Sequence, residues 1–99
     1  MNDLKQLLKD VTYTVITGTD EIRVTDLVID SRKAKEGCAF FCFIGANSDG
    51  HDYVKDVIPK GAAVIIIQKD PSEVPALAEA ADKNITVIQT ADTRYALAL

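Results

Sequence analysis

The fold is decided by residues 38–44, which read Cys38-Ala39-Phe40-Phe41-Cys42-Phe43-Ile44 and contain only apolar side chains. A continuous apolar run of this length predicts a strand that is buried on both faces of a sheet. The run AVIII at residues 63–67 predicts a second such strand, and ITVI at residues 85–88 predicts a shorter one. We therefore expect a sheet that is covered on both sides.

Helical patterns separate these strands along the chain. Residues 52–58 carry apolar side chains at helical spacing, and Pro59 and Gly61 are signals that end a helix. Residues 71–83 predict a second helix, which opens with two prolines and a serine. Because strands that alternate with helices are typical of α/β domains, we predict a small, largely parallel sheet flanked by helices.

The two ends of the sequence predict smaller elements. Residues 3–9 predict a short helix, and residues 12–17 and 22–29 predict strands that extend the sheet or form a small flap beside it. A last helix is expected from Thr93, with neither a C-cap glycine nor a polar tail before residue 99. This pattern favours a sequence cut from a longer protein. The alternative is a terminal helix packed on the sheet.

Composition narrows the class of protein. The 99 residues are 47% hydrophobic and 26% charged, which is the balance of one globular domain. A net charge of −4 argues against a nucleic-acid binder and against a basic protein of the membrane surface. The first ten residues carry four charged side chains and no apolar segment, so neither a signal peptide nor a membrane span is expected. These features predict a cytoplasmic protein.

The two cysteines are expected to be reduced thiols. Cys38 and Cys42 are four residues apart in a predicted strand, a separation of roughly 13 Å. A disulfide requires Cα atoms within about 4.4–6.8 Å. Two cysteines with a single histidine also make a poor zinc site, so no metal centre is predicted. Buried thiols are typical of a reducing compartment.

The sequence contains no recognisable catalytic constellation. It has no G-x-x-x-x-G-K-[ST] phosphate loop, no G-x-G-x-x-G dinucleotide fingerprint and no G-x-S-x-G nucleophile elbow. A single histidine, His51, limits catalytic triads as well as metal sites. We therefore predict no catalytic residue within these 99 residues.

Two polar segments follow predicted strands, where ligands of open α/β sheets bind. The first is IDSRK at residues 29–33, which places a hydroxyl group beside two cations. The alternative is a plain turn at Asp30 and Ser31 whose cationic neighbours face water. The second is GANSDGH at residues 45–51, whose consecutive amides suit an anion at a helix N-terminus. Here the alternative is a loop capped by Asp49 or His51, with the histidine anchoring the loop.

Taken together, spaced blocks of residues resemble a known family. These blocks are DSR at residues 30–32, KEGCAFF at 35–41, Gly45 with DGHDY at 49–53, and KGAA at 60–63. They resemble the N-terminal domain of the Mur ligases, the ATP-dependent enzymes that build the peptide stem of peptidoglycan, over residues 22–99. The match favours the MurE type, UDP-N-acetylmuramoyl-tripeptide synthetase. The MurF type, which usually has an aromatic residue where Ser48 stands, is the alternative within the family.

The resemblance implies a role and a site for the chain. Residues 1–99 would form the first of three domains of an amide-bond-forming ligase, with ATP and Mg²⁺ bound by the central domain. This domain would hold the uridine-diphosphate end of UDP-N-acetylmuramoyl-L-alanyl-D-glutamate, and the C-terminal domain would admit the incoming amino acid, diaminopimelate or lysine. The residues that match substrate contacts by position are Ile29, Ser31, Ala46, Asn47 and Ser48. A free-standing α/β module that binds a small molecule or a partner protein is the alternative outside the family.

Overall fold

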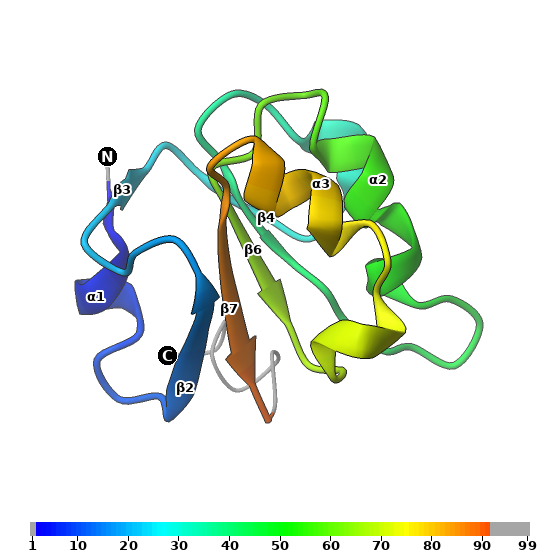
Figure 1. Cartoon of the computed structure of the whole chain (residues 1–99), viewed down its shortest axis with the longest axis horizontal. Coiled ribbons are helices and arrows are strands. Elements are labelled where there is room, and N and C mark those ends of the chain that lie inside the picture. The colour runs from blue at the N-terminus through cyan, green and yellow to red at the C-terminus, as the bar shows by residue number, and fades with distance from the viewer. Residues whose placement is uncertain (1, 92–99) are drawn as a thin grey trace.

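The computed structural model describes residues 2–91 and contains a five-stranded sheet (Figure 1). The strand order is β2-β7-β6-β5-β4, and every neighbouring pair is parallel except β2 with β7. The strands are β2 (Tyr13–Thr17), β4 (Leu27–Val28), β5 (Ala39–Phe41), β6 (Val64–Ile67) and β7 (Thr86–Thr90). The predicted α/β class and largely parallel sheet are confirmed.

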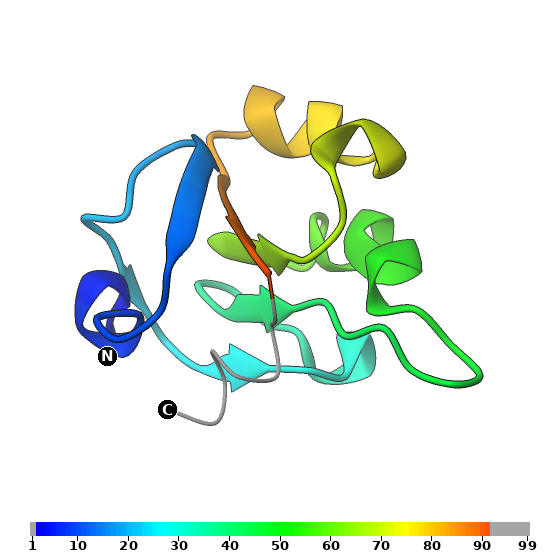
Figure 2. The ribbon, with the colours of Figure 1, turned by 90° about the horizontal axis from the view of Figure 1, so that it is seen from below.

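Short helices cover both faces of the sheet. The helices α2 (Val54–Val57) and α3 (Leu77–Asp82) lie together on one face, and α1 (Leu4–Leu7) lies on the other (Figures 1 and 2). Three single turns of 3₁₀ helix also occur: η1 (Ser31–Lys33), η2 (Gly50–Tyr53) and η3 (Pro71–Glu73). The turns η1 and η2 follow β4 and β5, and they build the site described below.

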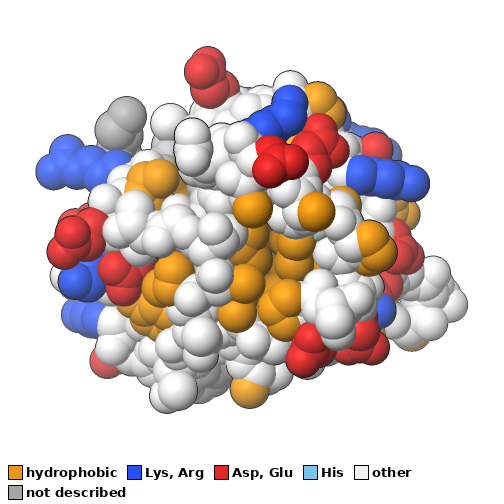
Figure 3. All heavy atoms as spheres, viewed as in Figure 1, with side chains coloured by type: hydrophobic (Ala, Val, Ile, Leu, Met, Phe, Trp, Pro, Cys, Tyr) orange, Lys and Arg blue, Asp and Glu red, His pale blue; other side chains and the backbone are white. Residues whose placement is uncertain are grey.

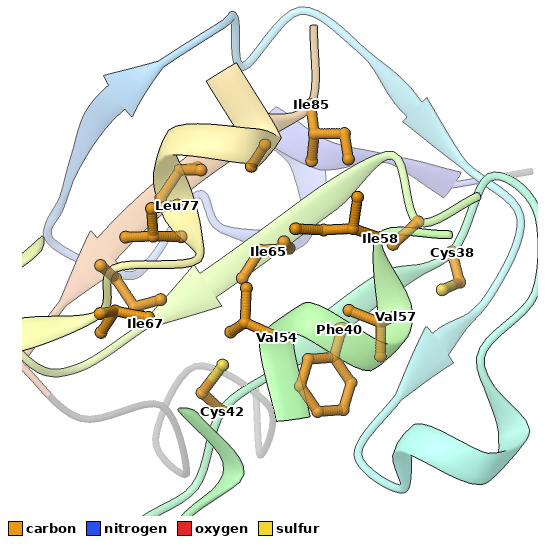
Figure 4. Close-up of a cluster of buried hydrophobic side chains, with 14 of the residues drawn as sticks. Cys38, Phe40, Cys42, Val54, Val57, Ile58, Ile65, Ile67, Leu77 and Ile85 are labelled. Carbon is orange, nitrogen blue, oxygen red and sulfur yellow. The ribbon is translucent and has the colours of Figure 1, made fainter. Parts of the chain in front are cut away.

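The main core lies between the sheet and the helices α2 and α3. Strand residues Phe40, Ile65 and Ile67 point toward Val54 and Leu77 of these helices (Figure 4). The alternate strand residues face a second core on the other side of the sheet, which α1 covers. Because both faces are buried, the apolar runs are continuous and do not alternate with polar residues.

The predicted strand at residues 22–29 is wrong as a single element. It divides into β3 (Arg23–Val24), which pairs with β1 (Asn2–Asp3) in a separate two-stranded sheet, and β4, which joins the main sheet. At the break, the hydroxyl of Thr25 donates to the carbonyl of Glu36 at 2.9 Å. Its backbone N–H also donates to the carbonyl of Gly37 at 2.9 Å. The predicted N-terminal strands therefore do both things expected of them: β2 and β4 extend the sheet, and β3 forms a flap with β1, a strand that was not predicted.

The predicted helix at residues 71–83 also divides, into η3 and α3. Val74, which precedes Pro75, has φ −126° and ψ 80°, outside the helical region. A proline disfavours helical conformation in the residue before it, and this explains the interruption. The helices predicted at residues 3–9 and 52–58 are present but shorter, and the helix predicted from Thr93 lies outside the described residues.

Burial and surface patterns complete the description. Cys38 and Cys42 are both fully buried thiols. Among residues 2–91, no helix has the length and apolar character needed to cross a membrane. On the face drawn in Figure 3, hydrophobic side chains gather near the centre, and acidic and basic side chains are interspersed around the margin.

Candidate functional site

A cleft of about 650 Å³ lies at the carboxyl ends of β4 and β5. These strands are parallel neighbours, so the segments that follow them leave the sheet side by side. One wall comes from the segment that ends in η1, and the other from the loop between β5 and η2. The lining residues are Ile29, Asp30, Ser31, Arg32, Phe43, Gly45, Ser48, Gly50 and Tyr53.

The structure brings three of the residues predicted from the sequence into this cleft. Ile29 and Ser31 line one wall, and Ser48 lines the opposite wall. Ala46 and Asn47 belong to the same loop as Ser48 but are exposed and do not line the cleft. The two polar segments therefore meet, with the exposed tip of the loop at the rim. Whether these residues contact a substrate stays a prediction.

The turn η1 is shaped by Asp30. Its carboxylate accepts a hydrogen bond from the backbone N–H of Arg32 at 3.0 Å and caps the turn. The Arg32 guanidinium donates to the same carboxylate at 3.1 Å and 2.8 Å. The side-chain hydrogen bonds from Arg32 are the main reason that the pKa of Asp30 is lowered to about 2. Asp30 thus has the structural role, and the turn that it caps presents Ser31 to the cleft.

The loop of residues 45–50 is closed by backbone hydrogen bonds at both ends. The N–H of Gly45 donates to the carbonyl of Ser48 at 2.8 Å, and the N–H of Gly50 donates to the carbonyl of Phe43 at 2.7 Å. A Cβ atom at Gly50 would lie 2.8 Å from the backbone nitrogen of Phe43, too close for any side chain. The close approach of two backbone segments therefore requires glycine at position 50.

His51 anchors this loop to the end of the neighbouring strand β6. Its side chain is buried, and Nδ1 lies 2.6 Å from Oδ1 of Asp49. Its Nε2 accepts hydrogen bonds from the backbone N–H groups of Gln68 at 3.0 Å and Lys69 at 3.3 Å. Because Nε2 faces two donors, this network assigns the ring proton to Nδ1, which donates to Asp49.

Asp49 is the acceptor at the centre of this hydrogen-bond network. It accepts from the ring and the backbone N–H of His51 and forms an ion pair with Lys69. Burial alone would raise the pKa of Asp49, but the hydrogen bonds from Lys69 and His51 outweigh burial and lower the pKa to about 2. Burial, followed by the negative charge of Asp49, raises the pKa of the neighbouring Cys42 thiol. A negative charge is thus held at the base of the loop of residues 45–50.

Sequence reasoning missed three residues of this region. Phe43 and Tyr53 line the cleft, and they lie just before and just after the polar segment of residues 45–51. Lys69 comes after β6, far from Asp49 in sequence, and no local pattern marks it as a partner of that carboxylate. Only the parallel pairing of β5 with β6 brings the ends of these strands together.

The residues present do not fit ATP or Mg²⁺. The sequence has no phosphate loop, and the part of the chain that the structure describes contains no group of three or more His, Cys, Asp or Glu side chains able to hold a metal ion. The cleft supports recognition through two serine hydroxyl groups, two aromatic rings, an aliphatic side chain and the charged side chains of Asp30 and Arg32.

Comparison with known proteins defines the class. Residues 23–99 match the family model described as Mur ligase family, catalytic domain. The chain therefore belongs to the Mur ligase family, and the resemblance seen in its spaced blocks is confirmed.

Particular relatives refine this assignment. The chain is 42% identical over 96 residues to the UDP-N-acetylmuramoyl-L-alanyl-D-glutamate–2,6-diaminopimelate ligase of Clostridium perfringens, covering 97% of this chain and 18% of that protein. It is 37% identical over 98 residues to the ligase of the same name from Oceanobacillus iheyensis, covering 98% of this chain and 18% of that protein. These relatives are of the MurE type, as the sequence predicted. The chain spans less than a fifth of their length.

Solved structures confirm the fold. A crystal structure of MurF from Acinetobacter baumannii superposes with a TM-score of 0.66 and 27% sequence identity, covering 96% of this chain and 19% of that one. The α/β domain with its flanking helices is thus a fold that the Mur ligases use.

Proposed function

We propose that this chain is the substrate-holding domain of a ligase that joins 2,6-diaminopimelate to UDP-N-acetylmuramoyl-L-alanyl-D-glutamate. The observation that carries the proposal is the cleft in which Ile29, Ser31 and Ser48 meet, in a chain whose curated relatives are named for this reaction. We propose that the cleft receives the uridine-diphosphate end of the substrate, with Ala46 and Asn47 at its rim.

The chemistry of the cleft suits a uridine nucleotide. Ile29 and Tyr53 are 54% and 42% exposed, and their apolar surface can cover a uracil ring. The hydroxyl groups of Ser31 and Ser48 can bond the ring or its ribose. Lys60 donates to the carbonyl of Ser31 at 2.8 Å, so it brings a positive charge beside η1. The positive charges of Lys60 and of Arg32, which lines the cleft, would let an acidic domain hold a diphosphate.

Catalysis is assigned to the rest of the protein. ATP and Mg²⁺ would be bound there, and ATP would supply the phosphoryl group that activates the D-glutamate carboxyl for attack by the incoming amine. This chain orients the substrate from its nucleotide end. The proposed location is the cytoplasm, and the buried thiols of Cys38 and Cys42 suit its reducing conditions. The pure chain is expected to turn over no ATP.

A MurF-type ligase is the second candidate, favoured by the fold similarity to MurF of Acinetobacter baumannii. The names of both kinds of ligase begin with a UDP-N-acetylmuramoyl substrate, so the nucleotide end does not distinguish them. The peptide part does. Binding of UDP-N-acetylmuramoyl-dipeptide in preference to the tripeptide form that contains diaminopimelate would support the first candidate.

Calorimetric titration of the chain tests the nucleotide site. UDP is expected to bind weakly and better than UMP or CDP, and UDP-N-acetylmuramoyl-dipeptide is expected to bind better than UDP. Ser31→Ala should weaken UDP binding. Ser72→Ala, an exposed serine in η3 outside the cleft, serves as the matched control and should have no effect. Absence of binding by both UDP and the dipeptide nucleotide would overturn the proposal.

A further inference from the structure

The only histidine of the chain is buried, and the proposed substrate contacts give it no role. His51 lies directly after the loop of residues 45–50, and its side chain joins that loop to the segment after β6. Both ring nitrogens are used, one toward Asp49 and one toward two backbone N–H groups. Such complete use of a buried side chain indicates that its position is closely determined.

We propose that His51, together with Asp49 and Lys69, is a positioning device that holds the substrate-facing loop in its binding conformation. We call these three side chains the clamp. The inference rests on the proposed function, because it assigns the clamp to the loop that would hold the nucleotide. His51 acts through the loop and does not line the cleft itself.

The loop needs such a device because residues 45–48 are exposed. Within the loop, the backbone hydrogen bond from Gly45 to Ser48 closes the tip, and an isolated bridge joins Ile44 to Asp49. The clamp adds long-range bonds at the base of the loop. Asp49 accepts from His51 and Lys69, and His51 in turn accepts from the backbone after β6.

The far end of the clamp is firmly held. Gln68 and Lys69 follow β6, a fully buried strand in the centre of the sheet. The side-chain amide of Gln89, in β7, donates to the carbonyl of Lys69 at 3.2 Å. The position of the loop is thereby fixed relative to two central strands, β6 and β7. A loop ordered before binding loses less conformational entropy when its ligand binds, which increases affinity.

Substitutions at His51 separate positioning from simple stability. His51→Phe keeps a ring and removes both nitrogens. In His51→Gln, the amide oxygen can accept from the N–H groups of Gln68 and Lys69, so partial rescue is expected. Lys69→Met removes the positive charge that pairs with Asp49 and keeps an unbranched side chain. Val87→Ala, in the core and away from the cleft, is the control for loss of stability alone.

The experiment measures UDP affinity by calorimetry and amide hydrogen exchange at residues 45–50 and 68–69, on the chain and its variants. His51→Phe is expected to lower UDP affinity about tenfold, the usual scale for removing a buried hydrogen-bonding partner. His51→Gln and Lys69→Met should lower UDP affinity less than His51→Phe does. Exchange should accelerate at residues 45–50 in His51→Phe. Val87→Ala should be less stable by urea denaturation but bind UDP like the unsubstituted chain.

A folded His51→Phe variant that binds UDP with unchanged affinity would overturn the proposal. An equal loss of affinity in Val87→Ala would also overturn it, because the effect would then follow general stability. If His51→Phe does not fold, Lys69→Met and His51→Gln carry the same test. If the unsubstituted chain binds neither UDP nor UDP-N-acetylmuramoyl-dipeptide, the proposed function fails, whereas unchanged hydrogen exchange at residues 45–50 in the folded variants would refute the clamp separately.

Discussion

Two short segments of this molecule, each capped by an aspartate, share the same local turn but differ in the partners of the capping carboxylate. Asp30 and Asp49 both follow a strand of the parallel sheet, and each caps a 3₁₀ turn by accepting a backbone N–H from the residue two positions later. The partner of Asp30 is Arg32, whose side chain is 87% exposed. The partners of Asp49 are the buried His51 and, from a distant part of the sequence, Lys69. The same local cap is a surface turn in one segment and an anchor to the sheet in the other.

The difference shows that a capping motif alone does not determine how much a turn contributes to stability. Exposed ion pairs contribute little, because water screens them and both side chains lose entropy. A carboxylate shielded from water, with several donors directed at it, is costly to remove because those donors lose their partner.

The largest effect is expected from Asp49→Ala. Its removal leaves the His51 ring and Lys69 without their acceptor, and we expect the free energy of unfolding to fall by about 2–4 kcal/mol. Asp30→Ala removes a surface cap, and its effect should be clearly smaller. Urea denaturation of the two variants measures both losses. Equal losses would contradict the contrast between the two segments.

The centre of the fold could be predicted from sequence because burial on both faces leaves a local signature. The continuous apolar runs around Phe40 and Ile65 predicted the α/β class and two buried strands correctly, but the strand expected over residues 38–44 is limited to Ala39–Phe41, and Ile44 is 42% exposed. The break at Thr25 could not be found in this way, because the hydrogen-bonding partners of Thr25 are Glu36 and Gly37, which are distant in sequence. The interruption before Pro75 does have a local signal, because a proline disfavours helical conformation in the residue before it.

The site was predictable to a similar extent. Ser31 and Ser48 follow strands, so topology alone predicts that their segments meet at one edge of the sheet. The partner of Asp49 was not predictable, because Lys69 reaches it only through the pairing of β5 with β6. Local patterns find residues that follow strands. They do not reveal which strand ends become neighbours.

The next effect concerns the substrate and compares the wall of the cleft with its rim. In the full-length enzyme, Ser31→Ala and Asn47→Ala should each cost about 1–3 kcal/mol of substrate binding, the usual cost of losing a hydrogen-bonding partner. The loss should appear as a raised KM for the UDP substrate with little change in KM for ATP, because the contact is far from the reacting carboxyl. Steady-state kinetics with each substrate varied in turn measures it. A raised KM for ATP alone would argue against a substrate contact at either residue.

Acid should weaken the anchored segment over a defined range of pH. The pKa of Asp49 in the folded chain is about 2, below the ordinary value of about 3.9 in an unfolded chain. A lowered pKa stabilises the folded chain at pH values above the pKa of the unfolded chain. This stabilisation is lost as the pH falls toward the pKa of the folded chain. We expect the contribution of the clamp to the free energy of unfolding to fall by about 1–2 kcal/mol between about pH 4 and pH 2.

Matched variants assign that loss to its source. Asp49→Asn should flatten the dependence of the unfolding free energy on pH in this range. Asp30→Asn should flatten it less, although the pKa of Asp30 is also about 2, because its partner Arg32 is 87% exposed and salt screens the pair. Urea denaturation at a series of pH values, repeated at high salt, provides the measurement. Equal flattening by the two variants would refute the contrast.

The smallest effect is expected at the two thiols, which lie at opposite ends of the same apolar run. Cys38 and Cys42 are both fully buried, so a thiol reagent should modify each slowly until denaturant is added. Cys42 is the one near the clamp, and the charge of Asp49 contributes to its raised pKa. Asp49→Ala loosens the loop and removes that charge, so labelling of Cys42 should accelerate more than labelling of Cys38. Peptide mapping by mass spectrometry separates the two sites. Rapid labelling of the unsubstituted chain would show that burial does not protect the thiols, and equal acceleration at both would mean that Asp49 stabilises the whole domain and not the loop in particular.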